Sequence, residues 1–184
     1  MSTTMPALAF AGIGLMGLPM CRRLLAAGYP LTLWNRNADK CLPLLQDGCQ
    51  RVQTPAELCR DAELVLLCLA DTAAVREVVF GEGGIVEGAR PGQLLIDFSS
   101  LEPAATREMA AELLARTGMH WMDAPVSGGE VGAKAADRHG PAFAGVAVDR
   151  DALDVIDQRV GKGGGRAGER EERQEVNGFH GAIG

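Results

Sequence analysis

Residues 12–17 of the chain, Gly12-Ile13-Gly14-Leu15-Met16-Gly17, carry the spacing Gly-x-Gly-x-x-Gly. The apolar run from Ala7 to Ala11 before them predicts a buried strand, and the apolar-periodic segment from Leu18 to Ala27 predicts a helix. Between a strand and a helix, this spacing is typical of a dinucleotide-binding site. The first glycine makes a tight turn, the second lets backbone approach a pyrophosphate, and the third allows close packing. A glycine-rich turn with chance spacing is the alternative, and the flanking elements argue against it.

The overall composition limits the classes of partner. The chain has 184 residues, 47% of them hydrophobic, which suits one globular domain with a full core. A net charge of −6 and an aromatic content of 4% argue against nucleic acid and against an anionic membrane surface. The apolar stretch near the start has its positive charges, Arg22 and Arg23, behind it, which is the wrong order for a signal peptide. We therefore expect a cytoplasmic protein with no nucleic-acid or membrane partner.

The cysteines show no pattern of a metal site or a disulfide framework. They are odd in number, irregularly spaced and without a Cys-x-x-Cys pair; their positions are Cys21, Cys41, Cys49, Cys59 and Cys68. We predict reduced, mostly buried thiols and no bound metal.

The end of the second predicted strand, Leu31 to Trp34, bears on the choice of cofactor. Asn35 and Arg36 follow it, about 20 residues past the glycines, where an acidic residue would bond the ribose 2′-hydroxyl of NAD. A guanidinium instead fits a 2′-phosphate in bidentate fashion. Asn35 and Arg36 therefore favour NADP over NAD, the alternative for Arg36 being an ordinary solvated charge. Asp39, farther along, suits the first turn of a helix better than a ribose contact.

The rest of the chain alternates between strand and helix patterns. After residue 34 we predict a helix over 38–46 that Pro43 weakens, a short strand at 51–52, a helix beginning at 54–57, a strand over 64–69, a helix over 73–80, a glycine-rich connection over 81–92, a strand over 94–97, a helix over 103–115 and a strand at 121–122. This order predicts an α/β fold with a Rossmann-type, doubly wound, mostly parallel sheet. Ligands of such sheets lie at the carboxyl ends of the strands, so we place Leu69 and Ala70 near the cofactor.

Four motifs occur in an order that resembles the cofactor domain of the β-hydroxyacid dehydrogenases. They are GIGLMGLPM at 12–20, LWNR at 33–36, DFSSLEP at 97–103 and DAPVSGGEVGA at 123–133. That family includes 3-hydroxyisobutyrate dehydrogenase, tartronate semialdehyde reductase and the glyoxylate/succinic semialdehyde reductases. The resemblance covers residues 8 to about 135 and implies hydride transfer between NADP(H) and a small β-hydroxy acid or semialdehyde.

The resemblance also implies roles for individual residues. Residues 12–17 would cradle the pyrophosphate, and Ser100 would touch the cofactor near its nicotinamide end. Ser127, Gly128 and Gly129 fall on the stretch that binds the substrate carboxylate through hydroxyl and backbone N–H groups. Consecutive N–H groups form an anion-binding nest, which suits that role. Without the surrounding motif, a flexible loop would be the better interpretation of these three residues.

The resemblance stops after Ala135. The family pattern continues with an apolar strand, whereas residues 136–140 read Ala-Asp-Arg-His-Gly, which cannot form a buried strand. Codons for these residues, read one base later, permit Leu-Thr-Ala-Met-Val, so we hypothesise a frameshift near Ala136 in the gene or its sequencing. From Gly161 onward eight of 24 residues are Gly and eight are charged. We predict a domain over 1–135 and an aberrant, largely disordered tail over 136–184.

No residue fits the catalytic position of the family. Its acid/base Lys lies in Gly-x-x-Gly-x-x-x-Lys-x-x-x-Asn, and here Gly165 and Gly168 are followed by Glu172 at the Lys position. Arg173 has the spacing one residue later, but a guanidinium is a poor proton donor. An inactive, cofactor-binding remnant is therefore the alternative to an active enzyme. Homo-oligomer formation is doubtful, because the family pairs through a helical domain that the resemblance does not reach.

Overall fold

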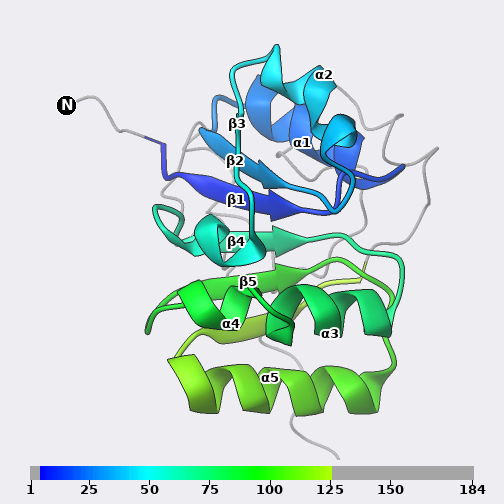
Figure 1. Ribbon diagram of the computed structural model, residues 1–184, viewed down its shortest axis with the longest axis vertical. Helices are drawn as coiled ribbons and strands as arrows, with labels where there is room; N and C mark the ends of the chain where they lie inside the picture. The colour runs from blue at the N-terminus through cyan, green and yellow to red at the C-terminus, as the bar shows by residue number, and fades with distance from the viewer. Residues whose placement is uncertain (1–4, 126–184) are drawn as a thin grey trace, which may run out of the picture.

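A computed structural model describes residues 5–125, which form one parallel sheet with helices on both of its faces (Figure 1). The strand order is β3-β2-β1-β4-β5-β6, and every neighbouring pair is parallel. The chain begins at a central strand, builds one half of the sheet outward, then crosses back to build the other half. This is the doubly wound Rossmann-type topology that the alternation of patterns predicted.

The elements lie close to their predicted positions. The strands are β1 (Leu8–Ala11), β2 (Leu31–Trp34), β3 (Gln50–Arg51), β4 (Leu64–Leu67), β5 (Leu94–Asp97) and β6 (His120–Asp123). The α-helices are α1 (Gly17–Ala26), α2 (Leu42–Leu45), α3 (Thr72–Phe80), α4 (Ile85–Gly88) and α5 (Pro103–Thr117). Two 3-10 helices, η1 (Ala38–Cys41) and η2 (Pro55–Cys59), complete the described part.

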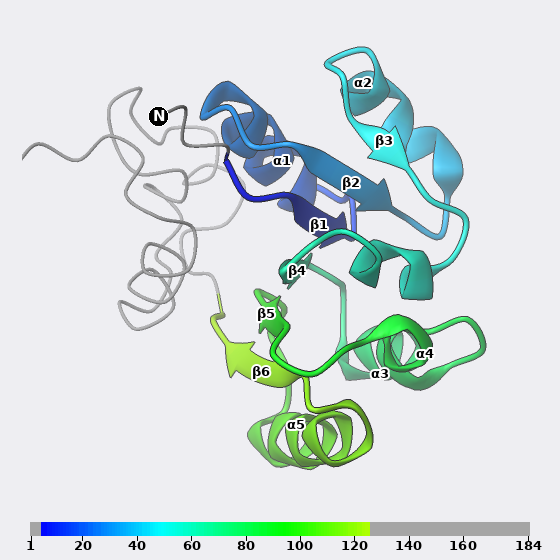
Figure 2. The ribbon, with the colours of Figure 1, turned by 90° about the vertical axis from the view of Figure 1, so that its left-hand side faces the viewer.

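The central strands are apolar along their whole length because both faces of the sheet are covered. All four residues of β1, of β4 and of β5 are buried. Alternate residues serve opposite faces: Leu64 and Leu66 join the cluster under α1 and α2, whereas Val65 and Leu67 join the cluster under α3, α4 and α5. Figure 2 shows the sheet nearly end-on, with α3, α4 and α5 together beside its lower half.

Three of the predicted elements differ from the structure. The helix predicted over 38–46 is split into η1 and α2, because Pro43 lacks an N–H and is accommodated only in the first turn of a new helix. The strand predicted over 64–69 ends at Leu67, so Cys68 and Leu69 already belong to the following turn. The connection over 81–92 contains α4, whose Gly88 lies against the backbone of Ala56.

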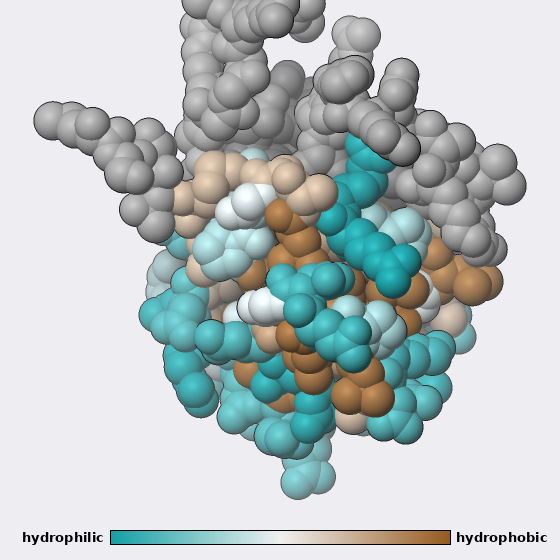
Figure 3. All heavy atoms as spheres, turned by 90° about the horizontal axis from the view of Figure 1, so that it is seen from above, coloured by the Kyte–Doolittle hydropathy of each residue, from teal (hydrophilic) through white to brown (hydrophobic). Residues whose placement is uncertain are grey.

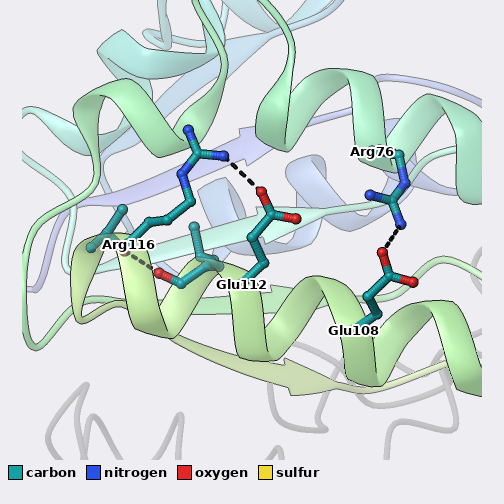
Figure 4. A network of polar contacts seen from close by, with 6 residues as sticks. Arg76, Glu108, Glu112 and Arg116 are labelled. Atoms are coloured by element: carbon teal, nitrogen blue, oxygen red, sulfur yellow. Dashed lines mark hydrogen bonds and ion pairs between the residues drawn. The ribbon is translucent and has the colours of Figure 1, made fainter.

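Helices α3 and α5 are joined at the surface by charged side chains (Figure 4). Arg76 of α3 forms an ion pair of 3.0 Å with Glu108 of α5. Arg116 pairs with Glu112 within α5 at 2.7 Å, and its guanidinium lies 5.7 Å from the centre of the Phe80 ring. Exposed pairs of this kind contribute about 0.2–1 kcal/mol each, so apolar packing accounts for most of the attachment of α5.

The surface of the described part is mixed in polarity. Figure 3 looks down on the end of the molecule where α1 and α2 lie and shows hydrophobic residues interspersed among hydrophilic ones. The large apolar side chains that are exposed come from three different segments, as Leu15, Leu42 and Leu114. No helix within residues 5–125 is long and apolar enough to cross a membrane.

Candidate dinucleotide-binding site

The three glycines of the loop between β1 and α1 have different surroundings. Gly12 is buried with φ at +103°, and a methyl group on it would overlap the carbonyl oxygen of Cys68. A methyl group on Gly17 would overlap the Gly12 carbonyl oxygen. Within residues 5–125, and apart from its two chain neighbours, Gly14 has no atom within 4 Å of the place where a Cβ would stand. The first and third glycines thus serve packing, and the second leaves open space where a pyrophosphate could approach the backbone.

The loop leaves backbone donors available at the start of α1. Among the hydrogen bonds of residues 5–125, none uses the N–H groups of Gly14, Leu15 or Met16. Met16 provides no side-chain cap, and the first turn of α1 contains no acidic residue. A helix N-terminus that keeps its N–H groups and its positive dipole end free is suited to bind phosphate. These features agree with the cradle predicted at residues 12–17.

Asn35, at the end of β2, connects this loop to the next turn. Its Oδ1 accepts a hydrogen bond of 2.8 Å from the Ile13 N–H, and its Nδ2 donates to the Asn37 carbonyl oxygen at 2.8 Å. Asn37 in turn caps η1, with its Oδ1 accepting from the Asp39 N–H at 3.0 Å. The structure therefore places Asn35 as a support for the glycine loop, and Asp39 in the first turn of a helix as predicted.

Arg36 lies beside Asn35 on the surface. It is exposed, and none of the ion pairs found in the described part of the chain involves it. A guanidinium without an internal carboxylate partner, placed at the carboxyl end of β2, is available to an external anion. The prediction that Arg36 meets a 2′-phosphate is compatible with this position.

The turns after β4 and β5 meet beside the glycine loop. Leu69 is half-buried, and its Cδ2 atom lies 2.9 Å from the place of a Cβ on Gly12. Its N–H donates to the Ser99 hydroxyl oxygen at 2.9 Å. Ala70 and Ser100 are both exposed. Leu69, Ala70 and Ser100, predicted to lie near the cofactor, thus occupy the carboxyl-end edge of the sheet together with the loop.

Asp97, the last residue of β5, is a fully buried carboxylate that sequence reasoning did not single out. Its Oδ1 accepts from the Ser99 N–H at 2.9 Å, whereas its Oδ2 has no hydrogen-bond partner among residues 5–125. Burial raises the pKa of Asp97 to about 6, with Asp123 adding to the shift and Ser99 opposing it. The available signal was a charged residue ending a continuous apolar strand, followed by two serines.

The cysteines are buried as predicted, apart from the half-buried Cys68. Burial, with a contribution from the Asp97 charge, raises the pKa of the Cys68 thiol to about 11. Burial also raises the pKa values of Cys49 and Cys59 to about 11. These thiols therefore stay protonated at neutral pH, and for Cys68, in the turn after β4, this disfavours thiolate chemistry beside the glycine loop.

Two parts of the sequence-based prediction lie outside the described residues. These are the substrate loop with Ser127, Gly128 and Gly129, and the tail over 136–184 with its hypothesised frameshift. The domain boundary at 135 lies there too.

Comparisons with known proteins assign the chain to a family. The family model of the NAD binding domain of 6-phosphogluconate dehydrogenase matches residues 7–141. The chain belongs to this family. The match confirms the resemblance drawn from the four motifs and identifies the glycine loop as part of an NAD(P)-binding domain.

Two curated relatives illustrate how diverse the family is. Over 123 residues the chain is 37% identical to the cytokine-like nuclear factor N-PAC of Xenopus tropicalis, covering 67% of this chain and 23% of that protein. Over 122 residues it is 38% identical to 3-sulfolactaldehyde reductase of Escherichia coli strain K12, covering 66% of this chain and 41% of the reductase. The chain thus spans less than half the length of either relative.

Solved structures support the same placement. The 3-hydroxyisobutyrate dehydrogenase of Mycobacterium tuberculosis, solved with L-serine, aligns with a TM-score of 0.70 and 28% identity, covering 85% of this chain and 51% of the enzyme. Psf3, solved in complex with NADP+ and 2-OPP, aligns with a TM-score of 0.69 and 26% identity, covering 84% of this chain and 53% of Psf3. This chain therefore shares its Rossmann-type fold with proteins of known structure, among them a hydroxyacid dehydrogenase.

Proposed function

We propose that the chain is the NADP(H)-binding domain of an oxidoreductase that interconverts a small β-hydroxy acid and its semialdehyde. The observation that carries this proposal is the glycine loop, in which Gly12 and Gly17 are packed against backbone while Gly14 and the N-terminus of α1 are left open. The relatives named for sulfolactaldehyde and hydroxyisobutyrate chemistry support the substrate class, a small molecule with an anionic group.

The preference for NADP rests on the end of β2. Arg36 is exposed there, and the neighbouring Asn35 offers no carboxylate that would repel a 2′-phosphate. Psf3 and the reductive aminase of Aspergillus terreus, which align with this chain, were solved with NADP+ and NADPH respectively. Guanidinium–phosphate pairing gives a physical reason for the same preference here.

The residues of this chain would bind and orient the cofactor. The N–H groups at the start of α1 would hold the pyrophosphate, and Arg36 the 2′-phosphate, while the turns that contain Leu69, Ala70 and Ser100 would flank the nicotinamide end. A bound nicotinamide cofactor supplies the hydride chemistry. Ser127, Gly128 and Gly129 would receive the substrate carboxylate.

Binding of the cofactor without turnover is the second candidate. It is favoured by Glu172, which stands where the family motif has its acid/base Lys. Lys40, the lysine of the described part, is exposed on η1 and is not at the strand ends of β4 and β5.

Two measurements on the full chain test these proposals. Titration with NADPH, followed by its fluorescence, is expected to show saturable binding that is tighter than for NADH; absence of binding would refute both candidates. Steady-state reduction of glyoxylate, succinic semialdehyde or 3-sulfolactaldehyde with NADPH then separates them. Turnover supports the oxidoreductase, and binding without turnover on any of the three aldehydes supports the remnant.

A further inference from the structure

The strand-end turns of β4 and β5 are joined by a side chain that the cofactor proposal does not use. Ser99 is almost fully buried, with 2% of its surface exposed. Its hydroxyl oxygen accepts the Leu69 N–H at 2.9 Å, and its own N–H donates to the Asp97 Oδ1 at 2.9 Å. Ser99 thus connects two segments that are 30 residues apart in the sequence.

This contact continues the attachment of the two strands after their ladder has ended. The register of β4 and β5 stops at Leu67 and Asp97, and the Phe98 N–H donates to the Leu67 carbonyl oxygen at 2.8 Å. Leu69 lies beyond that last backbone bond. Without the Ser99 hydroxyl, its N–H would lose the partner that holds the turn against β5.

The position of the Leu69 peptide matters because of what lies next to it. The Leu69 side chain and the Cys68 carbonyl oxygen both lie against the position that a Cβ on Gly12 would take, so there is no room for a methyl group. A shift of the turn after β4 would therefore move the atoms of Cys68 and Leu69 that lie against Gly12. The loop that offers its N–H groups to a pyrophosphate would move with it.

The carboxylate that accepts the Ser99 N–H, that of Asp97, is buried at a cost in free energy. Asp97 is fully buried, and its Oδ2 has no hydrogen-bond partner in the part of the chain that the structure describes. The titratable groups facing it are Cys68 at the end of β4 and Asp123 on β6, and neither supplies a positive charge. A buried carboxylate is costly unless hydrogen bonds compensate for its lost hydration, and the hydrogen bond that Asp97 accepts comes from the Ser99 N–H.

We propose that Ser99 is a positioning residue for the cofactor site. It fixes the Leu69 peptide and, through the packing of Leu69 and Cys68 on Gly12, the position of the glycine loop. The inference rests on the proposed NADP(H) binding. It assigns the adjacent serines different tasks: Ser100, exposed, is the predicted cofactor contact, whereas Ser99, buried, acts through Leu69 and touches no ligand itself.

The test compares NADPH binding in three variants of the full chain. Ser99→Ala removes the hydroxyl, and Ser99→Thr retains one. Thr117→Val is the control at the end of α5, because the Thr117 hydroxyl likewise accepts a backbone N–H, that of Met119 at 3.0 Å, and also donates to the Leu113 carbonyl oxygen at 2.7 Å. The end of α5 leads into the amino end of β6, whereas the glycine loop follows the carboxyl end of β1. Because the strands are parallel, Thr117 and the loop lie at opposite ends of the strands.

We expect Ser99→Ala to weaken NADPH binding by up to about 5- to 30-fold, which corresponds to the free energy of folding usually lost with one buried hydrogen bond. Ser99→Thr should recover most of that affinity, and Thr117→Val should bind within about twofold of the unaltered chain while also unfolding more easily. Hydrogen exchange of the Leu69 amide should be faster in Ser99→Ala and unchanged in Thr117→Val.

Each other outcome is decisive. If the unaltered chain binds NADPH and Ser99→Ala binds it equally well, the inference is refuted and the proposed function stands. If Thr117→Val weakens binding as much as Ser99→Ala, the effect is one of global stability and the inference is again refuted. If the unaltered chain does not bind NADPH, the proposed function fails, and the positioning role fails with it.

Discussion

Replacing Gly12 by Ala should destabilise the fold, whereas replacing Gly14 by Ala should affect only the cofactor. At Gly12, φ is +103° and a methyl group would overlap the Cys68 carbonyl oxygen. Backbone strain costs about 1–3 kcal/mol, and displacing packed atoms costs about 1–3 kcal/mol more. The expected loss is therefore roughly 2–6 kcal/mol out of a total stability of about 5–15 kcal/mol.

Gly14 is the matched control within the same loop. It lies outside the set of glycines with positive φ, and in the described part of the chain no atom beyond its two chain neighbours lies within 4 Å of its Cβ position. Gly14→Ala should therefore leave stability unchanged or raise it by up to about 1 kcal/mol, because Ala lowers the entropy of the unfolded chain. The added methyl group would stand where the pyrophosphate approaches, so we expect NADPH binding to weaken at least tenfold.

Urea unfolding, followed by circular dichroism, measures the first effect, and NADPH fluorescence measures the second. At about 4 °C per kcal/mol, Gly12→Ala should also lower Tm by roughly 8–24 °C. An unfolding midpoint of Gly12→Ala equal to that of the unaltered chain would refute the packing argument. A Gly14→Ala variant that unfolds as readily as Gly12→Ala would refute the distinction between the two glycines.

Three further predictions follow from individual side chains. Arg36→Ala should weaken NADPH binding about 10- to 100-fold through loss of charge-assisted hydrogen bonds but leave NADH binding nearly unchanged, and equal losses for both cofactors in parallel titrations would contradict a 2′-phosphate contact. The pKa of Asp97 is raised from 3.8 to about 6, so the folded state binds this proton more tightly than the unfolded state does. As pH rises between those two values, the free energy of unfolding should therefore fall by up to about 3 kcal/mol. Relative to Asp97→Asn, the unaltered chain should therefore become less stable from pH 4 to pH 6.5 in urea titrations; a constant difference would exclude this titration. Arg76→Ala should reduce the free energy of unfolding by at most about 1 kcal/mol, because its pair with Glu108 is exposed, and a loss above about 2 kcal/mol would show that the pair does more than join two surfaces.

Local patterns in the sequence were sufficient for the order of elements and for the glycine loop. The apolar runs at β1, β4 and β5 indicate strands covered on both faces, and the alternation with helices predicts a parallel sheet, because both signals depend on near neighbours. Short elements were harder: Pro43 divides a predicted helix, and α4 was hidden in a glycine-rich connection. Their form depends on what they pack against, as Gly88 does against Ala56.

The sequence by itself determined that this chain has a glycine loop with the spacing typical of dinucleotide-binding sites, and that Arg36 follows the second strand. Tertiary structure alone decided which side chains support that loop. Asn35 reaches Ile13 across 22 residues, and Ser99 reaches Leu69 across 30. Adjacent residues such as Ser99 and Ser100 look alike in sequence, yet one is buried and the other exposed. That difference arises only when strand register brings the ends of β4 and β5 together, because the partner of a buried polar group is set by packing between distant segments.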